Sequence, residues 1–322
     1  MTPDFRLEAN DDDITELIRK RLISLRVTDE AGIKSDALEI QLDDEGSHIN
    51  WPETGAVLTL KLGYKETGLS KLGLYSVDEV EYSGPVLRMT IRAKAADMRK
   101  TIKAQKKRFW EDTTLYDVVK AVSPDDLTPG VSQALRDIGF TYLEQNNESD
   151  LHFLTRIANE NGAVVKPTNG YLIVAPKGET ISISGQSLPV TIIQPSIIKR
   201  FRFTQAERNK YASVIAYWQD TDNAEKQLVR VGEDDPSFGL RHTYPNIDEA
   251  KRAAAAKFKQ LQRGLGNLEL TLLGNADIQA ESRIRLEGVR PPIQGEYAVT
   301  RVEHTFSSRG FITTCSAEIP TS

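Results

Sequence analysis

Strict alternation of apolar and polar side chains recurs over the first hundred residues of this chain. The apolar positions are Ile23, Leu25 and Val27, then Leu38, Ile40 and Leu42, then Leu58, Leu60 and Leu62, then Leu87, Met89 and Ile91. A period of two puts one face of a strand on a core and the other in water, as in antiparallel sheets and barrels. The first hundred residues are therefore expected to form a barrel-like antiparallel β domain.

A short helix is predicted just before these strands. Asp11 to Asp13 can cap its start, because side-chain oxygens accept hydrogen bonds from the first free N–H groups of a helix. Ile14, Leu17, Ile18 and Leu22 follow at helical spacing and are expected to form its apolar stripe.

The alternation returns after Pro195 and continues to the end of the sequence. Its apolar positions are Phe201 and Phe203, then Val214, Ala216 and Trp218, then Leu268, Leu270 and Leu272. One helix interrupts it, at about 246–263. Asn246 with Glu249 three residues later resembles a capping box, and Gly264 ends the helix. The last third of the chain is therefore expected to be a second β domain with one helix.

The region between the two β domains mixes helical and strand patterns. A helix is predicted from Thr113 or Thr114 to Val122, and a second one over residues 151–158 is stopped by Asn161-Gly162. Asn169-Gly170 separates two apolar runs and predicts a hairpin. Phe109 and Trp110, just before the first helix, are interpreted as the apolar anchor of this middle domain.

These patterns predict an α+β, mainly β fold: two barrel-like antiparallel β domains with a small α/β domain inserted between them. The expected boundaries are 1–104, 105–195 and 196–322, which fits a length of 322 residues, above the usual range of roughly 100–200 for one domain. The similar size and pattern of the two β regions indicate a duplicated architecture.

The bulk composition excludes several classes of protein. A net charge of -5, with 41 basic and 46 acidic residues, gives no overall attraction to nucleic acid. Cys315 is the single cysteine, so no intrachain disulfide forms, and the four histidines lie in different predicted elements without metal-binding spacing. No apolar run approaches the ~18 residues of a membrane-spanning helix. Neither a signal peptide nor a membrane anchor is expected.

Two loops imitate ligand-binding motifs. Residues 63–70 have the glycine spacing of a phosphate-binding loop, but Leu69 stands where the lysine must be. Residues 220–225 open like a calcium loop, but Ala224 and Glu225 occupy its fifth and sixth positions, so the ligand set and the sharp turn both fail. Both loops are interpreted as hairpin turns.

The basic stretch that ends the first β domain is the best nucleic-acid candidate. Its cations are Arg99, Lys100, Lys103, Lys106, Lys107 and Arg108. No aromatic platform or recognition helix accompanies them, so a solvated linker or a contact with an acidic neighbouring subunit is the favoured interpretation. The chain's 46 acidic residues leave a glycosidase pair open, yet no nucleophile elbow or zinc motif accompanies them. No catalytic, cofactor-binding or metal-ligating residue is predicted.

Four stretches in order resemble one protein family. Residues 145–162 (QNNESDLHFLTRIANENG), followed by the hairpin of residues 162–176, resemble the middle domain of the phage late control D family. Residues 14–44, 241–264 and 295–314 also match its pattern. The same signature occurs in baseplate hub proteins of contractile phage tails and in the hub portion of type VI secretion (VgrG) spike proteins.

The resemblance implies a homotrimer without cofactors, in which two β domains per subunit alternate around a ring. The ring would join a hexameric tail tube to a threefold central spike, in contact with other baseplate proteins and the tape measure protein. DNA would only pass through, in an infectious phage. Because the sequence ends at Ser322 without a needle of repeated strands, the spike is expected to be a separate protein. The host particle could equally be a headless tail-like bacteriocin. The alternatives are a tail-associated cell-wall hydrolase and a DNA-binding regulator of late genes.

Overall fold

A computed structural model describes residues 1–31, 36–95, 104–125, 127–168, 171–177, 190–205, 211–220, 223–233, 235–263 and 266–320. The chain divides into two compact units, which are described one at a time. Unit 1 comprises Met1–Met98, Val190–Arg202 and Leu268–Ala317, and unit 2 comprises Arg99–Pro189, Phe203–Asn267 and Glu318–Ser322. The division into three domains with the boundaries given above stays a prediction.

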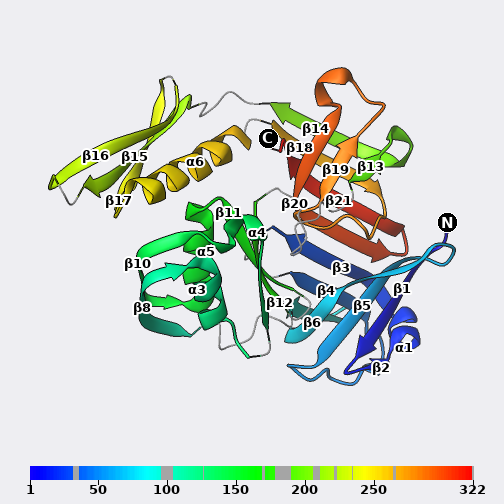
Figure 1. Ribbon diagram of the computed structural model, residues 1–322. Helices are drawn as coiled ribbons and strands as arrows, with labels where there is room; N and C mark the ends of the chain where they lie inside the picture. Colours follow the sequence, from blue (N-terminus) through cyan, green and yellow to red (C-terminus); the bar gives the residue numbers. More distant parts are fainter. Residues whose placement is uncertain are drawn as a thin grey trace. The chain divides into compact units, whose positions relative to one another are not determined.

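Unit 1 is built on one large sheet (Figure 1). Its strands from the first hundred residues are β1 (Pro3–Ala9), β2 (Asp12–Asp13), β3 (Leu22–Glu30), β4 (Ala37–Asp43), β5 (Val57–Tyr64), β6 (Gly68–Ser83) and β7 (Arg88–Ala95). Those from the later part of the chain are β13 (Thr191–Ile193), β14 (Ile198–Gln205), β18 (Gly266–Leu273), β19 (Arg283–Leu286), β20 (Gly295–Ser307) and β21 (Gly310–Glu318). The short helices are α1 (Thr15–Arg19), η1 (Pro195–Ile197) and η2 (Pro291–Ile293).

The alternating apolar positions of the first region form its core. Five of these side chains are at most 1% exposed: Leu25, Leu38, Ile40, Leu60 and Leu62. Their polar neighbours lie on the other face of the sheet, as a period of two requires. The predicted strands of this region are therefore confirmed.

The two β regions are joined by direct pairing of β3 with β20. The register runs antiparallel from Ser24↔Ser307 to Glu30↔Arg301. The complete order of the main path is β14-β18-β21-β20-β3-β4-β7-β6-β5-β1-β2, with β13 and β19 to one side. The mainly β, α+β class is confirmed. The described strands form an open path, and no closed barrel occurs among them.

Unit 2 contains three small sheets and four helices in its described part. Its first elements are β8 (Gln105–Thr114), α3 (Leu115–Val122), β9 (Thr128–Val131), α4 (Gln133–Arg136), β10 (Gly139–Ser149), α5 (Asp150–Glu160), β11 (Ala163–Thr168) and β12 (Tyr171–Pro176). They are followed by β15 (Ser213–Asp220), β16 (Glu225–Gly232), β17 (Ser237–Tyr244) and the fourth described helix of the unit, the long α6 (Ile247–Arg263). The sheets are β10-β8, β11-β12-β9 and β16-β15-β17.

Local capping signals placed the helices of unit 2 correctly. The Thr114 side chain accepts a hydrogen bond from the Asp117 N–H at the start of α3. Asn246 Oδ1 accepts from the Glu249 N–H at 3.0 Å, and Asn246 Nδ2 donates to Glu249 Oε1 at 2.8 Å, so the predicted capping box of α6 is confirmed. The β11–β12 pairing confirms the predicted hairpin. Its turn, Asn169-Gly170, lies outside the described residues, as does Gly264.

One part of the helix prediction near the N-terminus is wrong. The helix α1 exists, and Asp13 Oδ1 accepts from the Thr15 N–H at its start. Ile18 is buried, but Leu17 is 70% exposed. Because α1 has only five residues, its inward face holds fewer side chains than the predicted stripe, and Leu17 points away from the core.

Candidate functional site

Two cations of the basic stretch are paired with one carboxylate inside unit 2. Lys106 Nζ lies 2.5 Å from Asp150 Oδ2, and Arg108 Nη1 lies 3.2 Å from Asp150 Oδ1. Gln145 Nε2 donates to the same carboxylate at 2.8 Å, and Asp150 is 2% exposed. A buried carboxylate requires such partners, so Lys106 and Arg108 serve the fold and are not free to bind phosphates. Sequence reasoning missed this cluster, because nothing in the sequence marks Asp150 as buried.

Cations that precede the basic stretch are also paired. Arg92 contacts Glu39 at 3.2 Å, and Glu79 and Glu81 at 2.8 Å each. Lys94 forms an ion pair with Asp78. Arg99, Lys100 and Lys103 lie outside the described residues. Lys107 is exposed. Most of the described cations around the stretch are therefore paired with carboxylates of the chain itself.

Both motif-like loops are hairpin turns, as the sequence predicted. Tyr64 pairs with Gly68 across the first turn, and the Glu66 carboxylate accepts the Thr2 N–H at 2.8 and 2.9 Å. In the second turn Asp220 pairs with Glu225. Asp220 accepts from the Asn223 N–H and side-chain amide, so its carboxylate serves the turn.

The histidines do not form a metal site. His48, His152 and His242 are exposed on separate elements. His304 is 1% exposed, and burial lowers its pKa to about 4. No group of three potential ligands comes together among the residues that the structure describes.

The carboxylates in unit 2 offer two clusters that sequence reasoning did not find. At the end of β10, Glu148 is held by two side chains of α5, His152 Nδ1 at 2.8 Å and Arg156 Nη2 at 2.6 Å, beside a cavity of about 680 Å³. Burial alone would raise the pKa of Glu148, but these two partners outweigh it and lower the pKa. A general acid needs a raised pKa, so Glu148 is poorly suited to that role.

Glu160 and Glu249 form the second cluster. Burial raises the pKa of each carboxyl, and the charge of Glu249 raises the pKa of Glu160 further. Glu249 is already engaged by Asn246 in the capping box of α6. Neither residue lines the cavity beside Glu148. A raised pKa alone does not make a catalytic acid, because the acid must also lie within reach of a bound substrate.

Several large apolar side chains of the chain are exposed. An apolar cavity of about 470 Å³ opens beside α1, and Trp51, which is 61% exposed, lines it. On the β8–β10 sheet Trp110 stacks on Phe153 with ring centroids 4.8 Å apart, so its anchoring role is confirmed. Phe109 is 68% exposed, so its predicted anchoring role is wrong. Side chains alternate along β8, so the adjacent residues Phe109 and Trp110 point to opposite faces of the strand.

A mainly β chain with paired charges and exposed aromatic side chains has the features of a protein that works through contact surfaces. The chain belongs to the phage tail baseplate hub (GPD) family, whose sequence profile matches residues 74–310. It is similar to the probable baseplate hub protein of Escherichia phage 186, at 32% identity over 363 aligned positions that cover 99% of this chain and 93% of the relative. The corresponding protein of Escherichia phage P2 is also 32% identical, with 99% and 94% covered.

Solved structures share the fold at low sequence identity. A tail protein from Neisseria meningitidis MC58 superposes with a TM-score of 0.75 at 12% identity, covering 99% of this chain and 97% of that one. The 43 kDa tail protein of prophage MuSo2 from Shewanella oneidensis gives 0.73 at 12%, covering 99% and 98%. The E. coli c3393 protein, a type VI secretion component, gives 0.58 at 11%, covering 94% and 74%.

These findings confirm the resemblance to the late control D family. The chain is a baseplate hub protein of a contractile phage tail, with structural similarity to type VI spike proteins. The hydrolase and DNA-regulator alternatives receive no support. In its described part, the chain has no helix both long and apolar enough to cross a bilayer.

Proposed function

We propose that this hub protein is purely structural and forms a homotrimeric ring between the tail tube and a central spike. The observation that best supports this proposal is the β3–β20 pairing, which makes both β regions of one chain parts of a single sheet. Three such chains offer six β regions, which suits a junction between a hexameric tube and a threefold spike. In a closed symmetric ring of this kind, the function depends on the interfaces between chains rather than on a pocket.

The proposed partners are the tail tube protein on one side and a separate spike protein on the other. Other baseplate proteins and the tape measure protein would contact the same ring, and DNA would only pass through it. The ring would be assembled in the bacterial cytoplasm and end up in the baseplate of a virion or tail-like bacteriocin.

The mass of the purified protein in solution tests the ring directly. Light scattering on a size-exclusion column should give three times the 35.9 kDa chain mass, and addition of the spike protein should shift the peak further. A monomer that persists with the spike protein present would refute the trimer. Cleavage of peptidoglycan, or salt-sensitive binding of DNA, would refute the purely structural role.

A further inference from the structure

The large sheet of unit 1 has two different ends. The main path begins at β14, whose described pairing is with β18, and finishes at β1 and β2. Figure 1 labels the strands at both ends of this path. An edge strand presents unpaired backbone groups and is a common place for contact with another chain.

The β14 end is basic and exposed. Lys199, Arg200 and Arg202 are all exposed, and Phe201 between them is 47% exposed. No acidic residue occurs from position 190 to 205. These three cations have no ion-pair partner among the residues that the structure describes. We call these four residues the basic end.

The β2–α1 end carries the opposite charge. Asp11, Asp12, Asp13 and Glu16 are exposed there, and we call them the acidic end. Asp13 pairs with Arg6 at 3.2 Å, and Glu16 pairs with Arg19 at 3.0 Å. Asp11 and Asp12 have no ion-pair partner within the described part of the chain. Two uncompensated carboxylates therefore project from this end.

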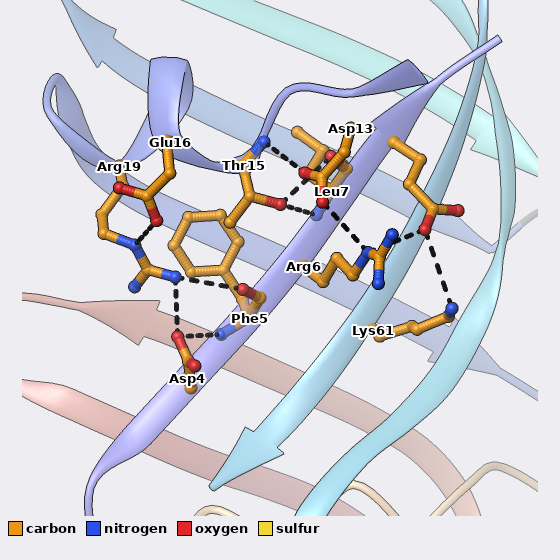
Figure 2. A network of polar contacts seen from close by, with 10 residues as sticks. Asp4, Phe5, Arg6, Leu7, Asp13, Thr15, Glu16, Arg19 and Lys61 are labelled. Atoms are coloured by element: carbon orange, nitrogen blue, oxygen red, sulfur yellow. Dashed lines mark hydrogen bonds and ion pairs between the residues drawn. The ribbon is translucent and has the colours of Figure 1, made fainter. Parts of the chain in front are cut away.

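Side chains of α1 seal the backbone edge of β1, as Figure 2 shows. The Leu7 N–H donates to Thr15 Oγ1 at 3.0 Å, and that hydroxyl lies 3.3 Å from the Leu7 carbonyl oxygen. Arg19 Nη2 donates to the Phe5 carbonyl oxygen at 3.3 Å, and the Phe5 N–H is taken by Asp4. Another strand therefore has no backbone groups to pair with at Phe5 and Leu7. A partner at this end must bind through side chains.

We propose that the basic end of one copy docks against the acidic end of the next copy around the ring. This inference rests on the proposed trimer and names the surfaces that close it. A ring built by rotation brings two different surfaces of the same chain together at every contact. Basic-to-basic or acidic-to-acidic contacts would place like charges opposite each other, which opposes association. Each copy of this chain supplies one basic end and one acidic end, so a second copy offers a complementary surface to either.

Charge reversal at each end tests the inference. One variant carries Lys199→Glu, Arg200→Glu and Arg202→Glu, and the other carries Asp11→Lys, Asp12→Lys and Glu16→Lys. Each reversal should raise the concentration at which the trimer dissociates by about 100-fold in low salt. The control variant carries Lys65→Glu, Lys71→Glu and Arg88→Glu, exposed cations elsewhere in unit 1, and should stay trimeric.

Recombining the variants makes the test specific. A chain with both reversals regains complementary ends and should form trimers again. A mixture of the two single-end variants should not form trimers. In that mixture every complementary contact needs one chain of each variant, so only a ring with an even number of chains can close with complementary charges at all its contacts. Sedimentation velocity distinguishes these species. The wild-type trimer should also weaken as salt rises, since these charges are exposed.

The outcomes separate the two proposals. Single-end variants that remain trimeric and folded by circular dichroism would overturn the docking of opposite ends and leave the trimer standing. Failure of the doubly reversed chain to trimerise, while folded, would also overturn it. A wild-type chain that never trimerises would refute the ring itself, and the docking with it.

Discussion

The imidazole of His304 lies with Nδ1 2.9 Å from the hydroxyl of Thr313 in unit 1. Its other nitrogen, Nε2, lies 3.2 Å from the Ile278 carbonyl oxygen. The ring therefore ties together β20, β21 and the segment between β18 and β19. Thr313 is itself fully buried, and it also accepts the Asn275 N–H. Burial disfavours the charged imidazole, and this outweighs the charge of Asp29, which favours it.

This contact predicts that the protein loses stability in mild acid. Burial lowers the pKa of His304 to about 4 in the folded state, against ~6.5 when unfolded. The unfolded chain therefore binds the extra proton first, and the free energy of unfolding falls as pH drops from 6.5 to 4. The loss is ~3 kcal/mol at most for this group.

Urea unfolding at several pH values measures that loss. The His304→Gln variant should be less pH-dependent between 6.5 and 4 than the wild type, because it has nothing to titrate. His48→Gln, at an exposed position, should keep the wild-type dependence. Identical slopes for His304→Gln and the wild type would contradict the assignment.

The buried carboxylate of Asp150 predicts a large effect of a small substitution. Asp150→Asn keeps the size of the side chain but leaves Lys106 and Arg108 without their anion. We expect a loss of ~3 kcal/mol in the free energy of unfolding, because removing one partner leaves the other charges uncompensated. Asp125→Asn, at an exposed position in the same unit, should change it by less than ~0.5 kcal/mol. Equal unfolding midpoints for the two variants would count against the buried cluster.

Substitutions at Gly68 and Gly232 allow the cost of backbone strain to be measured separately from the cost of a steric clash. Gly232 and Gly68 both have φ near +95°, which disfavours any residue with a side chain. A Cβ at Gly68 meets nothing within 4 Å, whereas one at Gly232 would lie 2.3 Å from the Ala212 carbonyl oxygen. Gly68→Ala should therefore cost ~1 kcal/mol, and Gly232→Ala at least ~1 kcal/mol more. Thermal unfolding of both variants measures the difference, and an equal cost would show that Ala212 moves aside freely.

Local patterns in the sequence predicted the elements but not their partners. Alternation identified the strands because burial of one face demands it, and Asn246 with Glu249 marked a helix start because capping is a local interaction. The pairing of Val27 with His304 joins positions far apart in the chain. Alternation says which face of each strand is buried and nothing about which strand lies beside it. The open path of the sheet was missed for that reason.

The functional prediction depended on a different kind of information. The sequence motifs led to the correct family. The Asp150 cluster could not be predicted, because a carboxylate buried by the fold looks like any other in the sequence. The charged ends of the sheet could not be predicted either. The sequence shows the charges at positions 11–16 and 199–202, but only the strand order shows that these positions lie at opposite ends of one sheet.

The seal on the edge of β1 gives the last prediction. Thr15 is 7% exposed, and its hydroxyl serves both the N–H and the carbonyl oxygen of Leu7. Thr15→Val replaces that hydroxyl with a methyl group of similar size. It should cost ~1–3 kcal/mol in the free energy of unfolding, because the Leu7 N–H is left buried without an acceptor.

Thr15→Ser keeps the hydroxyl and is the matched control for this site. It should retain most of the wild-type stability, since only a methyl group is lost. Hydrogen exchange at the Leu7 amide gives a second measurement: it should accelerate in Thr15→Val and stay slow in Thr15→Ser. If both variants protect that amide equally, water or another group replaces the hydroxyl, and the seal on this edge does not depend on Thr15.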